Sequence, residues 1–113
     1  MTAQGTGKEG ELLAARYLRK KGFAIVAMNY KTRLGEIDLI AERRGVTVFV
    51  EVKTRKNASF STAAEAVTPA KQQRLRLAAQ AWLAEKGECP CRFDVVEVYT
   101  QTRQIRHIQN AFS

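Results

Sequence analysis

The sequence predicts one domain of the α/β or α+β class, in which a mixed central β-sheet is flanked by helices. Two stretches with helical periodicity and five short apolar stretches indicate this class, because they follow one another in the order α-β-β-β-α-β-β. A length of 113 residues suits a single hydrophobic core, and the chain contains no internal repeat or linker. We therefore treat residues 1–113 as one domain.

The first helix is predicted over residues 7–21. Thr6 and Glu9 form a T-x-x-E capping box at its start, apolar residues then recur at helical spacing, and Gly22 ends the run. The short apolar segment 23–30 follows, and its length and boundaries are typical of a strand. We expect this part of the chain to fold as one helix and one strand.

Residues 36–42 and 46–53 are predicted to form the two strands of a β-hairpin, with Arg44 and Gly45 as the turn residues. The next segment, 54–67, carries basic and small polar residues with little periodicity. We expect this segment to be a mobile basic loop.

A second helix is predicted over residues 69–86. Thr68 offers the N-cap, Pro69 suits the first helical position, and an apolar stripe follows on one face. Residues 92–100 and 104–110 then have the pattern of two strands. These two strands complete the predicted five-stranded sheet.

The chain is strongly basic, with 19 lysine and arginine residues against 11 aspartate and glutamate residues and a net charge of +8. Such a charge attracts polyanions, so nucleic acid is the first partner to consider, ahead of an anionic membrane or an acidic protein. No apolar run approaches the ~20 residues needed to span a bilayer, and the first residues do not resemble a secretory signal. We expect a soluble, cytoplasmic protein without a membrane partner.

Several residues that could carry chemistry have simpler explanations. Cys89 and Cys91 lack the further ligands of a metal site and are expected to be reduced thiols near the start of a strand. Trp82 lies on the apolar stripe of the second helix and is expected in the core. His107 alternates with isoleucines on the last strand and is expected to be partly exposed. Asp94 could cap or pair within the sheet, and no role is assigned to it.

The predicted hairpin places acidic side chains next to each other. Side chains alternate along a strand, so Glu51 and Lys53 share one face with Phe49. With a two-residue turn, facing positions sum to 89, which sets Asp38 opposite Glu51. Like charges across a ladder repel, and a divalent cation such as Mg²⁺ or Mn²⁺ between the carboxylates would relieve this repulsion. The alternative is a solvated strand face with an ion pair between Glu36 and Lys53.

Glu11 supplies a further carboxylate from the first helix. At 100° per residue it falls in the same arc as Ala15 and Leu18, so it is predicted to point inward toward the sheet. An inward carboxylate needs a cation or a strong hydrogen-bond donor, because burial of an unpartnered charge costs several kcal/mol. The alternative is a glutamate at the rim of the helix, bonded to Tyr30 or to a lysine.

These residues match a known family. Residues 35–40, with the sequence GEIDLI, followed by residues 48–55, VFVEVKTR, resemble the D-x(n)-E-x-K signature of the PD-(D/E)XK nuclease superfamily. Ile37 stands where the superfamily label has proline, a position that contributes shape more than chemistry. More narrowly, the chain resembles the YraN family of small bacterial proteins, which are related to archaeal Holliday-junction resolvases. The likeness extends through RFDVV at 92–96 to HIQNAF at 107–112.

The resemblance implies a restriction-endonuclease-like core and a metal-dependent endonuclease activity on DNA, including branched or structured DNA. It implies that Asp38 and Glu51 hold Mg²⁺ or Mn²⁺, with the backbone carbonyl of Val52 as a further ligand. Glu11 would act directly or through water. Lys53 would orient the attacking water, help to deprotonate it, and stabilise charge on the phosphate. A homodimer would match the two-fold symmetry of a four-way junction.

Five residues are predicted to contact the nucleic acid backbone. Lys71 and Arg74 lie on the first turns of the second helix, where the dipole and free amide groups favour phosphate. Arg55 and Lys56 belong to the predicted basic loop, and Gln72 joins Lys71 in a motif that the family carries near the site.

Two other functions fit the same sequence. The first alternative is a catalytically silent nucleic-acid-binding module of a repair or DNA-processing complex, which would retain the fold without turnover. The second is a basic protein-interaction domain. Both predict that the acidic and lysine residues of the hairpin are dispensable, whereas a nuclease requires them.

Overall fold

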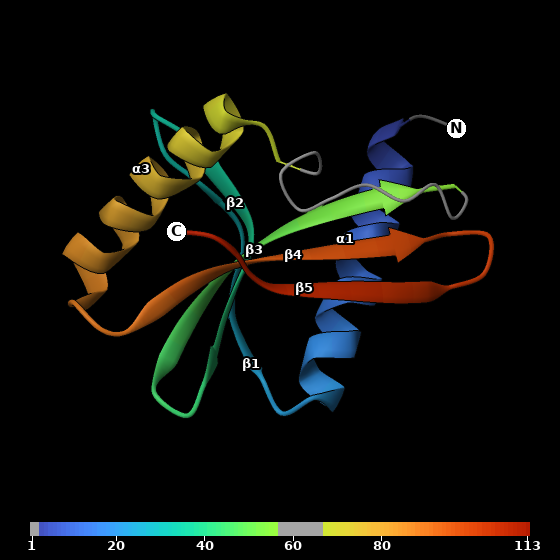
Figure 1. Ribbon diagram of the computed structural model, residues 1–113, viewed down its shortest axis with the longest axis horizontal. Helices are drawn as coiled ribbons and strands as arrows, with labels where there is room; N and C mark the ends of the chain where they lie inside the picture. The colour runs from blue at the N-terminus through green and yellow to red at the C-terminus, as the bar shows by residue number, and fades with distance from the viewer. Residues whose placement is uncertain (1–2, 57–66) are drawn as a thin grey trace.

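The computed structural model of the protein describes residues 3–56 and 67–113, with side chains from residue 8 onward within those ranges. Its elements follow the predicted order (Figure 1) and are α1 (Ala3–Lys20), β1 (Ala24–Lys31), β2 (Glu36–Arg43), β3 (Val46–Arg55), α3 (Pro69–Lys86), β4 (Cys91–Tyr99) and β5 (Gln104–Phe112). The five strands form one mixed sheet accompanied by two helices. This confirms the predicted α+β class and is consistent with a restriction-endonuclease-like core.

The sheet keeps the strands in sequence order, β1-β2-β3-β4-β5. The β1–β2, β2–β3 and β4–β5 pairs are antiparallel, and only the β3–β4 pair is parallel. A parallel pair needs a long crossover connection, and α3 lies in the segment that provides it. The central strand β3 therefore has a hairpin partner on one side and a crossover partner on the other.

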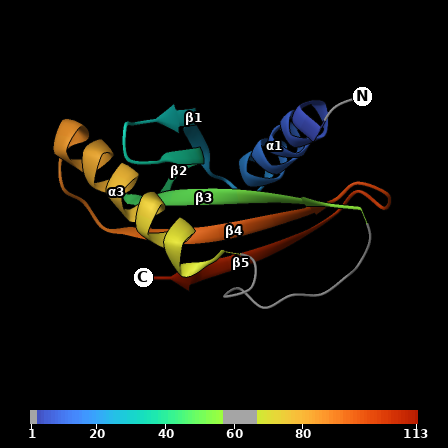
Figure 2. The same ribbon diagram turned by 90° about the horizontal axis from the view of Figure 1, so that it is seen from above.

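The two helices pack against opposite faces of the sheet, because side chains alternate along each strand. Phe49 and Ile40 belong to a core with Leu75 and Trp82 of α3, whereas Val48 and Val50 belong to a core with Leu18 of α1. Figure 2 shows α1 and α3 over different ends of the sheet. Trp82 is 9% exposed, so its predicted place in the core is confirmed.

The hairpin between β2 and β3 forms as its turn residues predict. Arg44 and Gly45 both have positive φ angles, 53° and 81°, as a two-residue hairpin turn with matching twist requires. The pairs Ile40↔Phe49 and Leu39↔Val50 keep the predicted sum of 89. The register of this hairpin is therefore confirmed up to Leu39.

Several predicted boundaries are wrong by a few residues. Helix α1 begins at Ala3, so Thr6 lies inside the helix rather than at its N-cap. Strand β3 continues through Arg55, because its parallel pairing with β4 extends as far as Arg55↔Tyr99. The predicted loop thus loses its first two residues to the strand, and most of its remainder, residues 57–66, lies outside the described residues.

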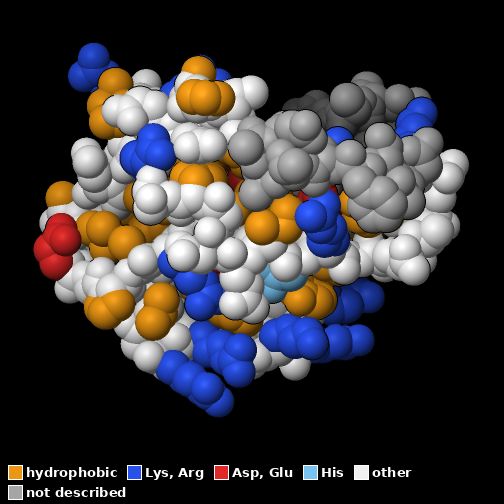
Figure 3. All heavy atoms as spheres, in the orientation of Figure 1, with side chains coloured by type: hydrophobic (Ala, Val, Ile, Leu, Met, Phe, Trp, Pro, Cys, Tyr) orange, Lys and Arg blue, Asp and Glu red, His pale blue; other side chains and the backbone are white. Residues whose placement is uncertain are grey.

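Basic side chains are prominent on the surface. On the face shown in Figure 3, lysine and arginine side chains are more prominent than acidic ones. Cys89 and Cys91 are both free and exposed. Within the described part of the chain, neither helix combines the length and apolar character needed to cross a lipid bilayer.

Candidate functional site

The candidate site lies where β2 separates from β3. Regular pairing in the hairpin ends at Leu39↔Val50. Asp38 is one residue nearer the start of β2. Its side chain, rather than its backbone, bonds to β3: Asp38 Oδ2 accepts a hydrogen bond of 2.8 Å from the Val52 amide. A side chain therefore holds the start of β2 to β3, and this bond fixes the position of the Asp38 carboxylate.

Glu51 lies beside Asp38 and is only 4% exposed. Two ammonium groups approach one of its oxygens: Lys71 Nζ is 3.2 Å and Lys53 Nζ is 3.7 Å from Oε2. The pKa of Glu51 is raised to about 7: burial is the largest cause, the charge of Asp38 and a hydrogen bond shared with it also raise the pKa, and both lysines lower it. Glu51 is thus a buried carboxyl group next to a second carboxylate and two cations.

Glu11 comes from α1, on the face of the sheet opposite α3. Its Oε1 accepts a hydrogen bond of 3.1 Å from Nδ2 of Asn29 in β1, and its side chain is half-buried. Partial burial raises the pKa of Glu11; the Asn29 hydrogen bond opposes this rise, and the charges of Asp38 and Glu36 add to it. Glu11 therefore belongs to the same acidic region, although its hydrogen-bond partner is neither Tyr30 nor a lysine.

The structure brings Asp38 and Glu51 together but does not add Glu11 to a common ligand set. Among residues 3–56 and 67–113, no group of three or more histidine, cysteine, aspartate or glutamate side chains is arranged to hold a metal ion. In this arrangement Glu11 lies outside a shared ligand set with Asp38 and Glu51, and its role at the site stays a prediction. Periodicity placed Glu11 on the correct side of the helix but could not reveal Asn29, which binds its carboxylate.

Three of the residues predicted to contact nucleic acid have different surroundings. Arg55 Nε donates a hydrogen bond of 2.9 Å to Glu97, which is completely buried, so the Arg55 side chain is tied to the sheet. Gln72 Nε2 donates a bond of 3.0 Å to the Val67 carbonyl. Lys56 is exposed just beyond the end of β3. Arg55 and Gln72 thus have structural roles that sequence patterns did not indicate.

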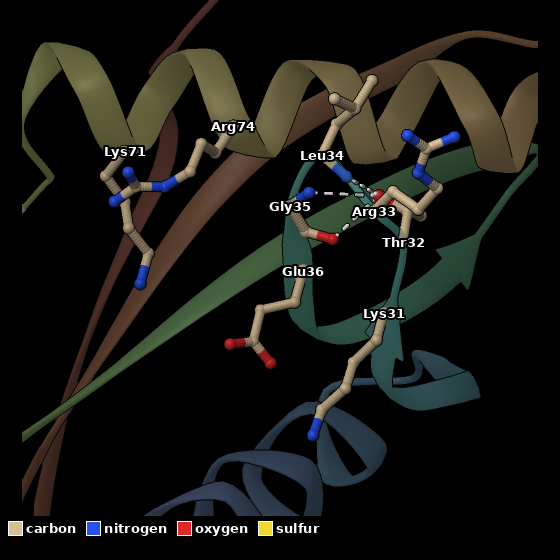
Figure 4. Close-up of a pocket in the computed structure, with 8 residues that line it drawn as sticks. All are labelled: Lys31, Thr32, Arg33, Leu34, Gly35, Glu36, Lys71 and Arg74. Atoms are coloured by element: carbon tan, nitrogen blue, oxygen red, sulfur yellow. Dashed lines mark hydrogen bonds between the residues drawn. The ribbon is translucent and has the colours of Figure 1, made fainter.

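The other two predicted contacts, Lys71 and Arg74, line a pocket. Thr68 caps α3 as predicted, because its Oγ1 accepts a hydrogen bond of 3.2 Å from the Lys71 amide. One amide that the sequence left free for phosphate is therefore already bonded. A pocket of about 390 Å³ opens between α3 and the turn that joins β1 to β2, lined by residues 31–36, Lys71 and Arg74 (Figure 4).

Asp94 in β4 anchors a buried network that the sequence did not reveal. Its carboxylate oxygens lie 2.7 Å from Nε2 of His107 and 3.0 Å from donors on Arg92 and the Asn110 backbone. The hydroxyl of Tyr17 lies 3.2 Å from Nδ1 of His107. Burial alone would raise the pKa of Asp94, but these hydrogen bonds lower it below the usual value.

This network joins β4, β5 and α1. His107 as a whole residue is partly exposed, as expected, but its side chain is only 5% exposed. An aspartate within the apolar run of β4 was the available signal, because a buried carboxylate requires partners. Two of its partners, His107 and the Asn110 backbone, come from the next strand, β5, and periodicity does not identify them.

Comparisons with known proteins place the chain in a family. Residues 10–98 match the family described as "Uncharacterised protein family UPF0102". The chain belongs to this family, which is the YraN family. It is 51% identical over 111 residues to a UPF0102 protein of Symbiobacterium thermophilum, covering 94% of each chain. It is 43% identical over 113 residues to a UPF0102 protein of Alkaliphilus metalliredigens, covering 97% of this chain and 99% of the relative.

A UPF0102 protein of Nocardia farcinica is 54% identical over 97 residues, which cover 84% of this chain and 76% of the relative. The part of the present chain that matches the family model, residues 10–98, includes both strands of the hairpin and α3. In this UPF0102 chain, the candidate site brings together the carboxylates of Asp38 and Glu51 and the ammonium groups of Lys53 and Lys71.

Proposed function

We propose that the protein is a divalent-cation-dependent endonuclease that hydrolyses phosphodiester bonds of DNA, including branched or structured DNA. The observation that carries the proposal is the buried Glu51 carboxylate next to the half-buried Asp38, with two lysine ammonium groups beside Glu51. The net charge of +8 supports a polyanionic substrate. If the substrate is a four-way junction, a homodimer would present two such sites to its two symmetric strands.

The donor set at this site fits Mg²⁺ or Mn²⁺. The carboxylates of Asp38 and Glu51 are hard oxygen donors, and the Val52 backbone carbonyl would supply a further one. Two carboxylates suffice, because Mg²⁺ usually keeps several waters and takes only one or two carboxylates from a protein. When bound, the cation supplies a Lewis acid that polarises the phosphoryl group and acidifies water.

The lysines provide positive charge where negative charge develops during phosphodiester hydrolysis. Lys53 would hydrogen-bond to the attacking water, help to remove its proton, and stabilise the phosphate charge. Lys71 would offer a second positive group to the same phosphate. Glu11 stays a predicted catalytic residue, and its bond to Asn29 supports an indirect role in orienting water rather than direct ligation.

A specific observation favours one alternative, a DNA-binding module without turnover. The ammonium groups at 3.2 Å and 3.7 Å partly offset the charge of Glu51 without any divalent cation. A purely structural ion-pair cluster would look the same. The two functions differ in their response to divalent cations, because only the nuclease requires Asp38 and Glu51 to bind one.

The test is incubation of purified protein with single-stranded, duplex, flapped and four-way DNA, with Mg²⁺ or Mn²⁺ and then with chelator. Cleavage should require the cation and should disappear in Asp38→Asn and Lys53→Ala. The matched controls Glu42→Gln and Lys20→Ala remove the same charges from exposed positions and should cleave normally. If DNA binds but no substrate is cut with either cation, the binding module replaces the nuclease.

A further inference from the structure

We infer that the pocket between the β1–β2 turn and α3 binds a backbone phosphate of the DNA strand, one next to the scissile phosphate. This inference rests on the proposed function for the identity of the substrate. It adds Lys31 and Arg33 to the nucleic acid interface and assigns Arg74 to a defined subsite within it.

The charge of the pocket points to an anion. Lys31, Arg33, Lys71 and Arg74 contribute four positive charges to the lining, and Glu36 contributes one negative charge. In the part of the chain that the structure describes, no carboxylate forms an ion pair with Lys31, Arg33 or Arg74. These cations are therefore available to a ligand, in contrast to Arg55 at its buried carboxylate.

The arrangement of the side chains fits a strand rather than a small free ion. Figure 4 shows the Arg74 side chain extending along α3 toward Lys71, while the Glu36 carboxylate points into the space between Lys71 and Lys31. The volume of about 390 Å³ lies within the usual range for a ligand site, so it can hold a phosphate with part of its sugar. A strand can place its phosphate beside Arg74 and away from Glu36.

The walls of the pocket are fixed relative to each other. Thr32 Oγ1 accepts hydrogen bonds of 3.1 Å from the amides of Leu34 and Gly35, and the Thr32 amide donates one of 2.8 Å to the Gly35 carbonyl. A Cβ on Gly35 would lie 2.2 Å from the Arg74 carbonyl oxygen, so the turn touches the α3 backbone directly. Such pre-organisation reduces the entropy lost when a ligand binds.

Lys71 connects the pocket to the candidate site. Its side chain lines the pocket, while its Nζ lies 3.2 Å from the Glu51 carboxylate. A strand that presents one phosphate to the Asp38–Glu51 pair therefore passes the pocket within the reach of the same lysine. The pocket would position the strand, and the carboxylate pair would act on the neighbouring linkage.

The test measures binding of a fluorescent DNA duplex in Ca²⁺ or in chelator, so that it does not depend on cleavage. The variant Arg33→Ala/Arg74→Ala is compared with Arg16→Ala/Arg19→Ala, which removes two exposed arginines from α1. The slope of log K against log salt is negative. If the pocket holds one phosphate, this slope should become shallower by about 0.9 in the pocket variant only. The affinity of this variant should fall about tenfold at about 50 mM salt.

A charge-preserving variant separates binding from folding. Arg33→Lys/Arg74→Lys should keep the wild-type slope, because lysine also neutralises phosphate. If the alanine pair unfolds, the single variant Arg74→Gln at an exposed position is read by the same criterion. Equal losses in the pocket and α1 variants would overturn the inference, since they would reflect net charge alone.

The pocket and the nuclease proposal can fail separately. A selective loss of slope with no cleavage under any condition would support the pocket and overturn the endonuclease. Cation-dependent cleavage with pocket variants that match the α1 control would support the endonuclease and overturn the pocket. Placing neutral methylphosphonate linkages one at a time should weaken wild-type binding at one position beside the cut, with no such effect in the pocket variant.

Discussion

Replacing Glu51 with glutamine should stabilise the cation-free protein at about pH 8. The pKa of Glu51 is raised from 4.5 to about 7, first by burial and then by the charge of Asp38, against the opposing effect of Lys71 and Lys53. A pKa difference of about 2.5, at about 1.4 kcal/mol per pKa unit, corresponds to about 3 kcal/mol. Glutamine has the shape of the protonated side chain and cannot ionise, so the variant avoids this cost.

The sign of the effect depends on pH. Because the pKa of Glu51 is higher in the folded protein, its contribution to stability is fully present below about pH 4.5 and is lost as pH rises to about 7. The variant lacks this titration. The difference in free energy of unfolding between Glu51→Gln and wild type should therefore grow from near zero at about pH 4 to about 3 kcal/mol at about pH 8.

The assay is urea unfolding in chelator across this pH range, with Glu42→Gln at an exposed position as the control that should show no such growth. Addition of Mg²⁺ at about pH 8 should then stabilise wild type, because a ligand bound only by the folded state raises the free energy of unfolding. The Glu51→Gln variant should lose most of this gain. A variant that is less stable than wild type in chelator at about pH 8 would refute the reasoning.

Three further substitutions test the fold around the site by urea unfolding. Asp94→Asn should lower the free energy of unfolding by about 3 kcal/mol near neutral pH, because buried hydrogen-bond donors lose their charged partner. This loss should vanish in acid, because the pKa of the wild-type Asp94 lies below 3.8 and the side chain is protonated there. Gly35→Ala should cost about 1–3 kcal/mol or more, since its Cβ meets the Arg74 backbone carbonyl. Gly10→Ala should lower the free energy of unfolding by less, because its Cβ meets the Thr54 hydroxyl, and adding Thr54→Ala should remove this clash. Equal losses of stability for Gly35→Ala and Gly10→Ala would contradict this explanation.

Features set by neighbouring residues in the chain could be predicted from the sequence. The two turn residues of the hairpin determine a register that places Leu39 opposite Val50, and this pairing is observed. Thr68 and Pro69 mark the start of α3 because capping depends on groups a few residues apart. Element order and helix faces follow from the same local periodicities.

Features set by distant residues could not be predicted in this way. The separation of β2 from β3 at Asp38 depends on a side chain that bonds to the Val52 amide, which the alternation pattern does not contain. The pairing of Arg55 with Glu97 joins residues 42 positions apart in neighbouring strands. Charge and spacing therefore indicated which residues gather near the site, but not which of them are already bound by the fold.

The environment of Glu51 connects stability with the proposed chemistry. Lys71 and Lys53 approach its carboxylate from different elements, yet burial and Asp38 outweigh them and its pKa remains raised. Two ammonium groups therefore do not fully compensate the ionised pair. A divalent cation bound to both carboxylates would supply the missing positive charge and lower the pKa of Glu51. It would also weaken the attraction between Glu51 and the two ammonium groups, which could then face a phosphate. The uncompensated negative charge that destabilises the cation-free protein therefore favours the proposed cation-bound active form.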